Sequence, residues 1–540
     1  MTTVQDPLRT SQNVNASGNI CRMVLTLAAM TLVLGLAAAP AAAQQPAQPA
    51  PLDSVRADTT RRALVNADSL LAATQDGRRI QRLIGRVRVL QDSTRLRSNR
   101  AIRYLDRRSY LFIGDVVIIE RGDTLRANRV RYDERRKIGR AEGNVRLSDG
   151  EVRVQAPSGV YYANEKRSQF ENGVTLIDST STLESARGAY FSEDKRAEFY
   201  GNVRFRDRNT YLEADSVTYF RESGATDARG QVSIERYASP TDEVAADSTT
   251  RTLLFGRRAR SRPDSSYSRV EGKALLVRLR ADSAGTPTDT LLVQARQMET
   301  FRTDALRRFT ATDAVRIWQP TLAAVADSAV FDRTARDTTV RRDESRLYRA
   351  PVVWFERSQV MGDTMQVVGY GGGIDTLRVR SEAFAAQLDT TLSRIQQLKG
   401  RRLRGYFRQD SLRTLAAGPN ARAIWHLSKE NDAPNGATKA SGDRIVLHFE
   451  GGDVQRVRVL SGVQSTYFSE ENMPASLKLE GFRWTPDRRP TKDAFLRRDR
   501  VLEWLRRDAA LARAPTSPPS PSLRPSPRPL PPSPKSQQSP

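Results

Sequence analysis

Hydrophobic and polar residues alternate strictly along a large part of this chain. In the stretch RAEFYGNVRFR, residues 196–206, Phe199, Gly201, Val203 and Phe205 alternate with polar, charged or outward-facing neighbours. A period of two is typical of a β-strand with one buried face. The sequence therefore predicts a strand here whose apolar side chains point inward and whose arginines face water.

The second half of the same unit changes phase. After the polar residues DRNT, Leu212 and Ala214 form another apolar pair, but Val217 and Tyr219 are in phase with each other and out of phase with Leu212. Such a shift requires a corner or a β-bulge near Asp215. The pattern predicts about three short strands and two or three bends in each unit.

The unit repeats with a period of 29 residues. A valine column consists of Val87, Val116, Val145, Val174, Val203 and Val232. An aliphatic column nine residues later consists of Leu96, Leu125, Val154, Leu183 and Leu212, and a tyrosine column of Tyr132, Tyr161, Tyr190 and Tyr219. A β unit of this length cannot bury its apolar face alone, so the units must stack.

Stacked units predict an all-β solenoid, a rod with a continuous apolar interior, which resembles a folded taco if it is open along one edge. The parity excludes a helical solenoid, and the period excludes a hexapeptide β-helix. With one strand spacing of about 4.8 Å per unit, the six valines would form a ladder roughly 24 Å long. The glycine two residues before each valine either makes room in the interior or forms a bulge.

Composition changes along the chain and predicts its organisation. A pair of hairpins is expected at 403–415 and 444–460, a glycine-rich hinge at 369–376, and an amphipathic helix near the end. The predicted segments are a signal peptide at 1–43, a linker at 44–75, β-repeats at 76–368 with an insertion at 237–268, a second β region at 369–492, the helix at 493–513 and a Pro/Ser-rich disordered tail at 514–540.

The N-terminal segment predicts export. Arg22 precedes an apolar run that ends in small residues, so cleavage is expected after Ala43. The only cysteine, Cys21, would be removed with this segment, which leaves no thiol for disulfides or cysteine zinc sites. The net charge of +25 comes mostly from arginines spread over the whole chain. In an exported protein they indicate a solvated strand face or affinity for a phosphate-bearing polymer or amphiphile, not for nucleic acid.

Candidate chemistry is sparse. The two histidines, His426 and His448, stand apart without a cysteine or carboxylate cluster, so neither a metal nor another cofactor is expected. Many aspartates, such as Asp215, fall at predicted corners, where a carboxylate can accept hydrogen bonds from nearby backbone N–H groups. The sequence therefore predicts a protein that is not an enzyme.

The apolar interior is the remaining candidate for function. If the coil is open along one edge, the apolar columns would line a groove with an arginine-rich rim, where acyl chains and anionic head groups could bind. If it is closed, the side chains fill the interior themselves. The pattern alone is compatible with either arrangement.

The repeats resemble those of the OstA-like, or organic solvent tolerance, family of lipopolysaccharide-transport proteins. The resemblance rests on GDVVIIERGDTLRANRVRY, GNVRLSDGEVRVQAPSGVYY and GNVRFRDRNTYLEADSVTYF, which match a G-N-V … L-x-A-D-x-x-x-Y pattern. QQLKGRRLRGYF at 396–407 and LEGFRWTPDRRPTKDAF at 479–495 are similar to the C-terminal portion of long OstA-like proteins. The resemblance covers roughly residues 60 to 495.

The resemblance implies a periplasmic β-jellyroll, at or near the outer membrane, that binds lipopolysaccharide or another anionic lipid and joins other jellyroll proteins of a transport bridge end to end. The lipid-binding candidates that it implies are the inward columns Val116, Leu125, Val145, Val154, Val174, Leu183, Val203, Phe205 and Leu212. The alternative is a structural or adhesive β-solenoid, closed inside, that binds an envelope partner with its exposed faces.

Overall fold

The structure is a computed structural model of the whole chain. It describes residues 64–91, 94–120, 123–148, 153–177, 181–191, 193–207, 210–220, 223–237, 249–281, 287–303, 305–335, 341–371, 373–450, 453–497 and 501–503. The predicted signal peptide, residues 44–63 of the predicted linker, and the Pro/Ser-rich tail lie outside these residues. The rest of the predicted linker, residues 64–75, contains two strands, Leu64–Asn66 and Ser69–Gln75. The chain divides into two compact units, residues 1–491 and 492–540, and each is described by itself.

The first unit is one antiparallel β-sheet of 32 strands among the described residues. The strands of its N-terminal half are β1 (Leu64–Asn66), β2 (Ser69–Gln75), β3 (Arg78–Gln91), β4 (Thr94–Tyr104), β5 (Ser109–Glu120), β6 (Asp123–Asp133), β7 (Ile138–Ser148), β8 (Arg153–Tyr162), β9 (Arg167–Glu171), β10 (Val174–Ile177), β11 (Thr182–Ser185), β12 (Arg187–Phe191), β13 (Arg196–Arg206), β14 (Thr210–Phe220), β15 (Ala225–Tyr237) and β16 (Thr249–Arg262). Those of its C-terminal half are β17 (Tyr267–Ala281), β18 (Pro287–Arg302), β19 (Leu306–Trp318), β20 (Leu322–Ala335), β21 (Arg341–Tyr348), β22 (Val352–Phe355), β23 (Ser358–Met361), β24 (Thr364–Tyr370), β25 (Gly373–Asp389), β26 (Arg394–Arg408), β27 (Ser411–Gly418), β28 (Ala421–Ser428), β29 (Pro434–Gly442), β30 (Arg444–Glu450), β31 (Asp453–Leu460) and β32 (Gln464–Phe468).

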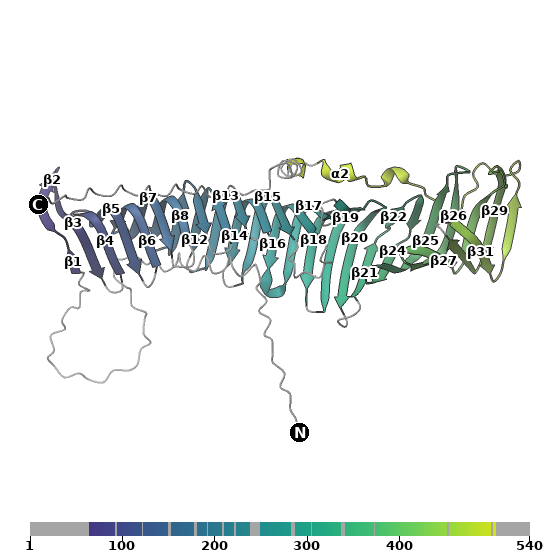
Figure 1. Cartoon of the computed structure of the whole chain (residues 1–540), viewed down its shortest axis with the longest axis horizontal. Helices are drawn as coiled ribbons and strands as arrows, with labels where there is room; N and C mark the ends of the chain where they lie inside the picture. Colours follow the sequence, from purple (N-terminus) through teal and green to yellow (C-terminus); the bar gives the residue numbers. More distant parts are fainter. Residues whose placement is uncertain are drawn as a thin grey trace, which may run out of the picture. The chain divides into compact units, whose positions relative to one another are not determined.

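The sheet is a meander. Each long strand pairs with the next one along the chain, as β13 does with β14 and β14 with β15, and Figure 1 shows the strands following one another in chain order. One 29-residue repeat is therefore two long strands, not three short ones, because the bend that was expected to end a strand only interrupts its pairing. Consecutive valines of the column lie two strands apart, so the ladder is about 48 Å long, twice the expected length.

The bend in each long strand is a bulge at the glycine. Pairing between β13 and β14 shifts by one residue between Tyr200 and Val203, where Gly201 and Asn202 have φ of 80° and 48°. Positive φ values are favourable for glycine, which has no Cβ, and asparagine tolerates them better than most other residues. A Cβ on Gly201 would also lie 2.8 Å from the Ala186 Cβ of the neighbouring strands. Of the two roles expected for this glycine, the structure shows the bulge.

The bulges divide every long strand into two halves, and the halves form two walls. The valine wall carries the valine column, as in residues 203–206 of β13, and the tyrosine wall carries the tyrosine column, as in residues 216–220 of β14. Pairing between β14 and β15 also shifts between Glu213 and Ser216, which confirms the predicted corner near Asp215. In some repeats the two halves are separate strands, such as β9 and β10.

Both walls pack their inner faces into one hydrophobic cluster that extends from Val87 to Leu447. In the tyrosine wall, Tyr132 pairs with Gly139 and Tyr219 with Ala197, so each large ring has a small neighbour on the adjacent strand. Burial raises the pKa of Tyr132 to about 12. Pairs of a large and a small side chain let the interior of these repeats pack densely.

The sheet continues past the predicted boundaries. Most of the described part of the predicted insertion is β16, which pairs with β15 and β17 along its length. The glycines expected to form a hinge lie in the hairpin between β24 and β25, where Tyr370 pairs with Gly373. The two predicted β regions therefore share one sheet. The hairpins expected at 403–415 and 444–460 are confirmed as β26–β27 and β30–β31.

Residues 469–491 contain no strand; we call them the strap. Leu477, Leu479, Phe482 and Trp484 of the strap pack in a second hydrophobic cluster with Trp354 and other residues of β20, β22, β23, β25 and β28. Neighbouring residues of these strands alternate between the two clusters, as Phe384 and Ala385 do. The strap therefore covers the outer face of the valine wall, while the first cluster fills the inner face.

In the second unit, the described residues include the short helix α2 (Lys492–Leu496), and residues 501–503 are also helical. The helix expected at 493–513 is seen only in this part, because residues 504–513 lie outside the described ones. No helix in the described part of the chain is long and apolar enough to cross a membrane.

Arginine–carboxylate pairs stabilise the outer face of the tyrosine wall in the middle of the sheet. Asp227 accepts hydrogen bonds from Arg258 Nε at 2.8 Å and Arg229 Nη2 at 3.0 Å. Burial alone would raise the pKa of Asp227, but these hydrogen bonds outweigh it and lower the pKa from 3.8 to about 2. The carboxylate therefore stabilises the fold above pH 3.8, and this contribution is lost as the pH falls through about 2.

Asp227→Asn should make the fold less sensitive to acid. We expect wild-type stability to fall more steeply than that of the variant between pH 3.8 and about 2, by on the order of 1 kcal/mol after solvent screening. Urea unfolding at several pH values measures this difference. Asp432→Asn, at an exposed turn, is the control and should follow the wild type. Parallel curves for wild type and Asp227→Asn would contradict the assignment.

Candidate functional site: an apolar interior between two walls

The nine lipid-binding candidates all lie on the inner face of the valine wall, in β5, β6, β7, β8, β10, β11, β13 and β14. Eight of them are buried, from Val203 at 0% exposed to Phe205 at 6%, and Leu212 is half-buried against the same cluster. The structure therefore brings all nine together in one interior. In these repeats side chains fill that interior.

The facing wall was not among the candidates. Phe112, Ala141, Phe170, Phe199 and Ala228 form a further column with the period of 29 and belong to the same cluster. Together with the tyrosines, they line the interior from the tyrosine wall. The signal was present in the sequence, since this column has the same spacing as the valines, but only its member Phe199 was read as inward-facing.

The interior opens at the C-terminal end of the sheet. A cavity of about 250 Å³ lies between the last strands of the two walls, and we call it the mouth. Leu398, Ala423 and Trp425 line it from the valine wall, and Leu447 and Val459 from the tyrosine wall. Most of these residues belong to, or pack against, the continuous cluster, so the mouth is an extension of the interior. Nothing in the sequence distinguishes it, because its residues have the same alternation as the filled repeats.

The strands around the mouth have free edges. Within the described residues β31 pairs only with β30, and β32 only with β29. Apolar side chains there are exposed, with Val457 at 45% and Val463 at 55%. The other end is similar, since β1 and β2 pair only with β3 in the described part of the sheet and expose Leu70 at 61%. Unpaired strand edges are sites where another strand can add.

The titratable groups near the mouth are few. His426 in β28 is 8% exposed, and burial lowers the pKa of its imidazole. The Nδ1 atom of His426 has no hydrogen-bond partner among the residues that the structure describes. The side chain of Gln396 binds the backbone of His426: the Gln396 Oε1 accepts a hydrogen bond from the His426 N–H at 2.7 Å. Among the described residues, no group of three or more His, Cys, Asp or Glu side chains could hold a metal ion.

Comparison with known proteins finds a similarity over the N-terminal repeats. Residues 59–205 match the family model of OstA-like proteins. Among solved structures, the crystal structure of LptH, the LptA homologous periplasmic component of the lipopolysaccharide transport device of Pseudomonas aeruginosa, is 14% identical, with a TM-score of 0.13, and the match covers 35% of this chain and 90% of LptH. The search of curated proteins found no match. The matched residues include the first five valines of the column, from Val87 to Val203.

Proposed function

We propose that this chain is a non-catalytic protein of lipopolysaccharide transport in the periplasm, which holds the acyl part of a lipid A-type amphiphile between its two walls. The OstA-like match over residues 59–205 supports the class of function. The predicted signal peptide supports the compartment. The proposal assigns no catalytic residue and no cofactor.

The observation that carries the proposal is the mouth. A core that served only for stability would be capped by polar residues at its ends, as the ends of repeat proteins usually are. Here the apolar interior continues into a cavity, and Val457 and Val463 remain exposed beside it. An acyl chain could enter there without breaking the hydrogen bonds of the sheet. Burying its methylene groups would contribute about 0.8 kcal/mol each.

The same end would join a partner. The free edges of β31 and β32 at one end, and of β1 and β2 at the other, support end-to-end contact with other jellyroll proteins of a transport bridge. Such contact would place the mouth against the interior of the next module. Lipid could then pass from one interior to the next without crossing water.

Site-specific photo-crosslinking in cells that make lipopolysaccharide tests this proposal. We expect a photoreactive residue at Val457 in the mouth, or at Leu212 or Leu183 in the interior, to form adducts with lipopolysaccharide, detected by immunoblot and mass spectrometry. Arg204 faces outward in β13 beside Val203 and is the control position. Absence of adducts at all three inward positions, or equal labelling at Arg204, would overturn the proposal.

The burial of the valine-wall candidates favours a second function, that of a closed β-solenoid which binds an envelope partner with its outer faces. In that case no inward position would form a lipid adduct, and lipid would not copurify with the protein. Outward positions such as Arg204 would instead crosslink to protein. Mass spectrometry of the purified chain distinguishes the two functions, because only the first predicts bound lipid.

A further inference from the structure

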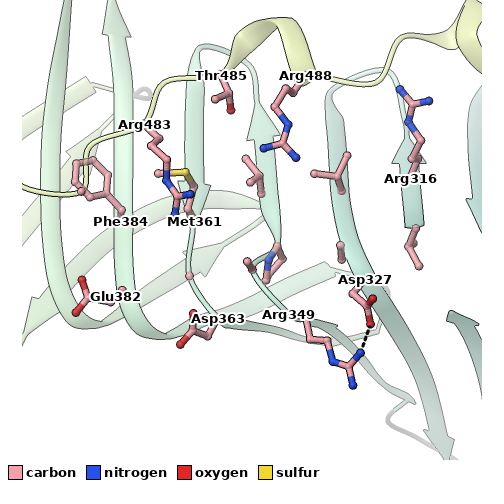
Figure 2. A pocket seen from close by; sticks show the side chains of 18 of the residues that line it. Arg316, Asp327, Arg349, Met361, Asp363, Glu382, Phe384, Arg483, Thr485 and Arg488 are labelled. Carbon is pink, nitrogen blue, oxygen red and sulfur yellow. Dashed lines mark hydrogen bonds and ion pairs between the residues drawn. The ribbon is translucent and has the colours of Figure 1, made fainter. Parts of the chain in front are cut away.

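A second and larger cavity lies between the strap and the valine wall, and it extends to Val315 and Ala326 of the interior cluster. Its volume is about 710 Å³. Val352, Met361 and Phe384 form an apolar part of its lining, and Gly481, Arg483, Thr485 and Arg488 of the strap close one side. Figure 2 shows the side chains of Arg483, Thr485 and Arg488 extending from the strap, and Arg316 of β19 lies on the strap side of the cavity. Nothing in the interior or the mouth involves these side chains.

The charges in this cavity are separated. Two of its carboxylates already have partners: Asp327 is 3.1 Å from Arg349 Nη1, and Glu382 is 2.8 Å from Lys399 Nζ. Lys399 also donates to the Glu480 carbonyl at 3.2 Å. The third carboxylate, Asp363, lies across the cavity from the strap, near Glu382 and Arg349 (Figure 2).

Three arginines are left without a carboxylate. The guanidinium groups of Arg316, Arg483 and Arg488 form no ion pair and no hydrogen bond within the described part of the chain. This contrasts with the middle of the sheet, where Arg308 and Arg346 both bind Asp332. These three unpaired guanidinium groups border one cavity, with Arg488 between Arg483 and Arg316 in Figure 2, and they add positive charge to its strap side.

The backbone that carries these arginines is held by a buried side chain. Gln359 of β23 is 0% exposed. Its Nε2 donates to the Arg483 carbonyl at 2.7 Å, and its Oε1 accepts from the Thr485 N–H at 2.9 Å and from Trp354 Nε1 at 3.0 Å. The Arg488 N–H donates in turn to the Thr485 carbonyl at 3.2 Å. The strap is therefore fixed where it presents its arginines, which lowers the entropy lost when a ligand binds.

We propose that the cavity under the strap binds a phosphate group. Arginine forks bind phosphate oxygens through pairs of charge-assisted hydrogen bonds, and three of them match the charge of a phosphate or diphosphate. The Thr485 hydroxyl, which lies 3.3 Å from Gln359 Oε1, adds a further polar group on the strap side. The phosphate can belong to a lipid head group, whose apolar part would contact Met361 and Phe384, or to a soluble compound.

Calorimetric titration of the full chain tests the inference with two probes, inorganic phosphate and dihexanoyl phosphatidic acid below its micelle concentration. The test variant is the triple substitution Arg316→Gln, Arg483→Gln and Arg488→Gln. The control is Arg88→Gln, Arg97→Gln and Arg126→Gln, which removes the same charge from three exposed arginines of the N-terminal repeats. Circular dichroism verifies that both variants fold.

We expect the triple variant to bind at least tenfold more weakly than the wild type, and the control to bind within about twofold. A phosphatidic acid affinity well above that of phosphate identifies a lipid head group as the source, and equal affinities identify a soluble phosphate. Equal weakening in both variants, or no heat from either probe with the wild type, would overturn the inference. The result is independent of the interior, since crosslinking at Val457 reports on that site alone.

Discussion

Val203→Asp should unfold the repeats around it. The Val203 side chain is 0% exposed between the two walls, so the new carboxylate would be buried without a partner or would force the walls apart. Burial of an unpaired charge is among the few single changes that cost more than about 4 kcal/mol. Because each hairpin pairs only with its neighbours, the loss should stay local. Hydrogen exchange should rise over residues 174–232 and stay low over 373–450.

Arg204→Asp is the matched control, because it places the same carboxylate one residue further on the outer face. Arg204 Nε lies 3.9 Å from Glu213 Oε1, and losing this partly exposed ion pair should cost no more than about 1 kcal/mol. If the Val203→Asp variant were as stable as the Arg204→Asp variant, water would have to reach the interior at this position. That result would contradict the packed core of the repeats and favour an open groove there.

Gln359→Leu should release the strap. Leucine leaves the Trp354 Nε1–H, the Thr485 N–H and the Arg483 carbonyl without their bond to Gln359. Each buried polar group that loses its partner costs about 1 to 3 kcal/mol, so we expect a loss of about 3 kcal/mol or more in local stability. Limited proteolysis should then cut within residues 469–491 before it cuts the sheet.

Gln464→Leu, at an exposed position in β32, is the control and should leave the cleavage pattern unchanged. Because Gln359 does not line the cavity under the strap, its loss should also weaken phosphate binding while all three arginines remain. A strap that stayed protected in Gln359→Leu would show that the apolar contacts of Leu479, Phe482 and Trp484 hold it without the glutamine. In that case its arginines would be positioned by packing alone.

The repeats were predictable because their information is local. The alternation around Val203 specifies a strand with one buried face, and the period of 29 places Val116, Val145 and Val174 in one column. The phase change after Ala214 located the bulge. Whether a bend ends a strand or only interrupts its pairing depends on hydrogen bonds to the neighbouring strands. For that reason the predicted number of strands per repeat was wrong, and the predicted length of the valine ladder was half the observed one.

The last strands and the strap were less predictable, because their partners are distant in sequence. Leu479, Phe482 and Trp484 look like apolar residues of a loop until β20, β22, β23, β25 and β28 present an apolar outer face to them. Gln359 is one polar residue in a strand, and its bonds reach residues more than a hundred positions away.

The sequence by itself determined that the chain is a stack of β-hairpins with an apolar interior and an arginine-rich exterior. Only the tertiary structure decided where that interior is filled and where it opens, because Val203 and Val457 have the same local pattern and differ in whether another strand lies beside them. It also decided which arginines are paired. Arginines of the middle strands bind carboxylates across the sheet, whereas Arg316, Arg483 and Arg488 line one cavity and form no ion pair within the described residues.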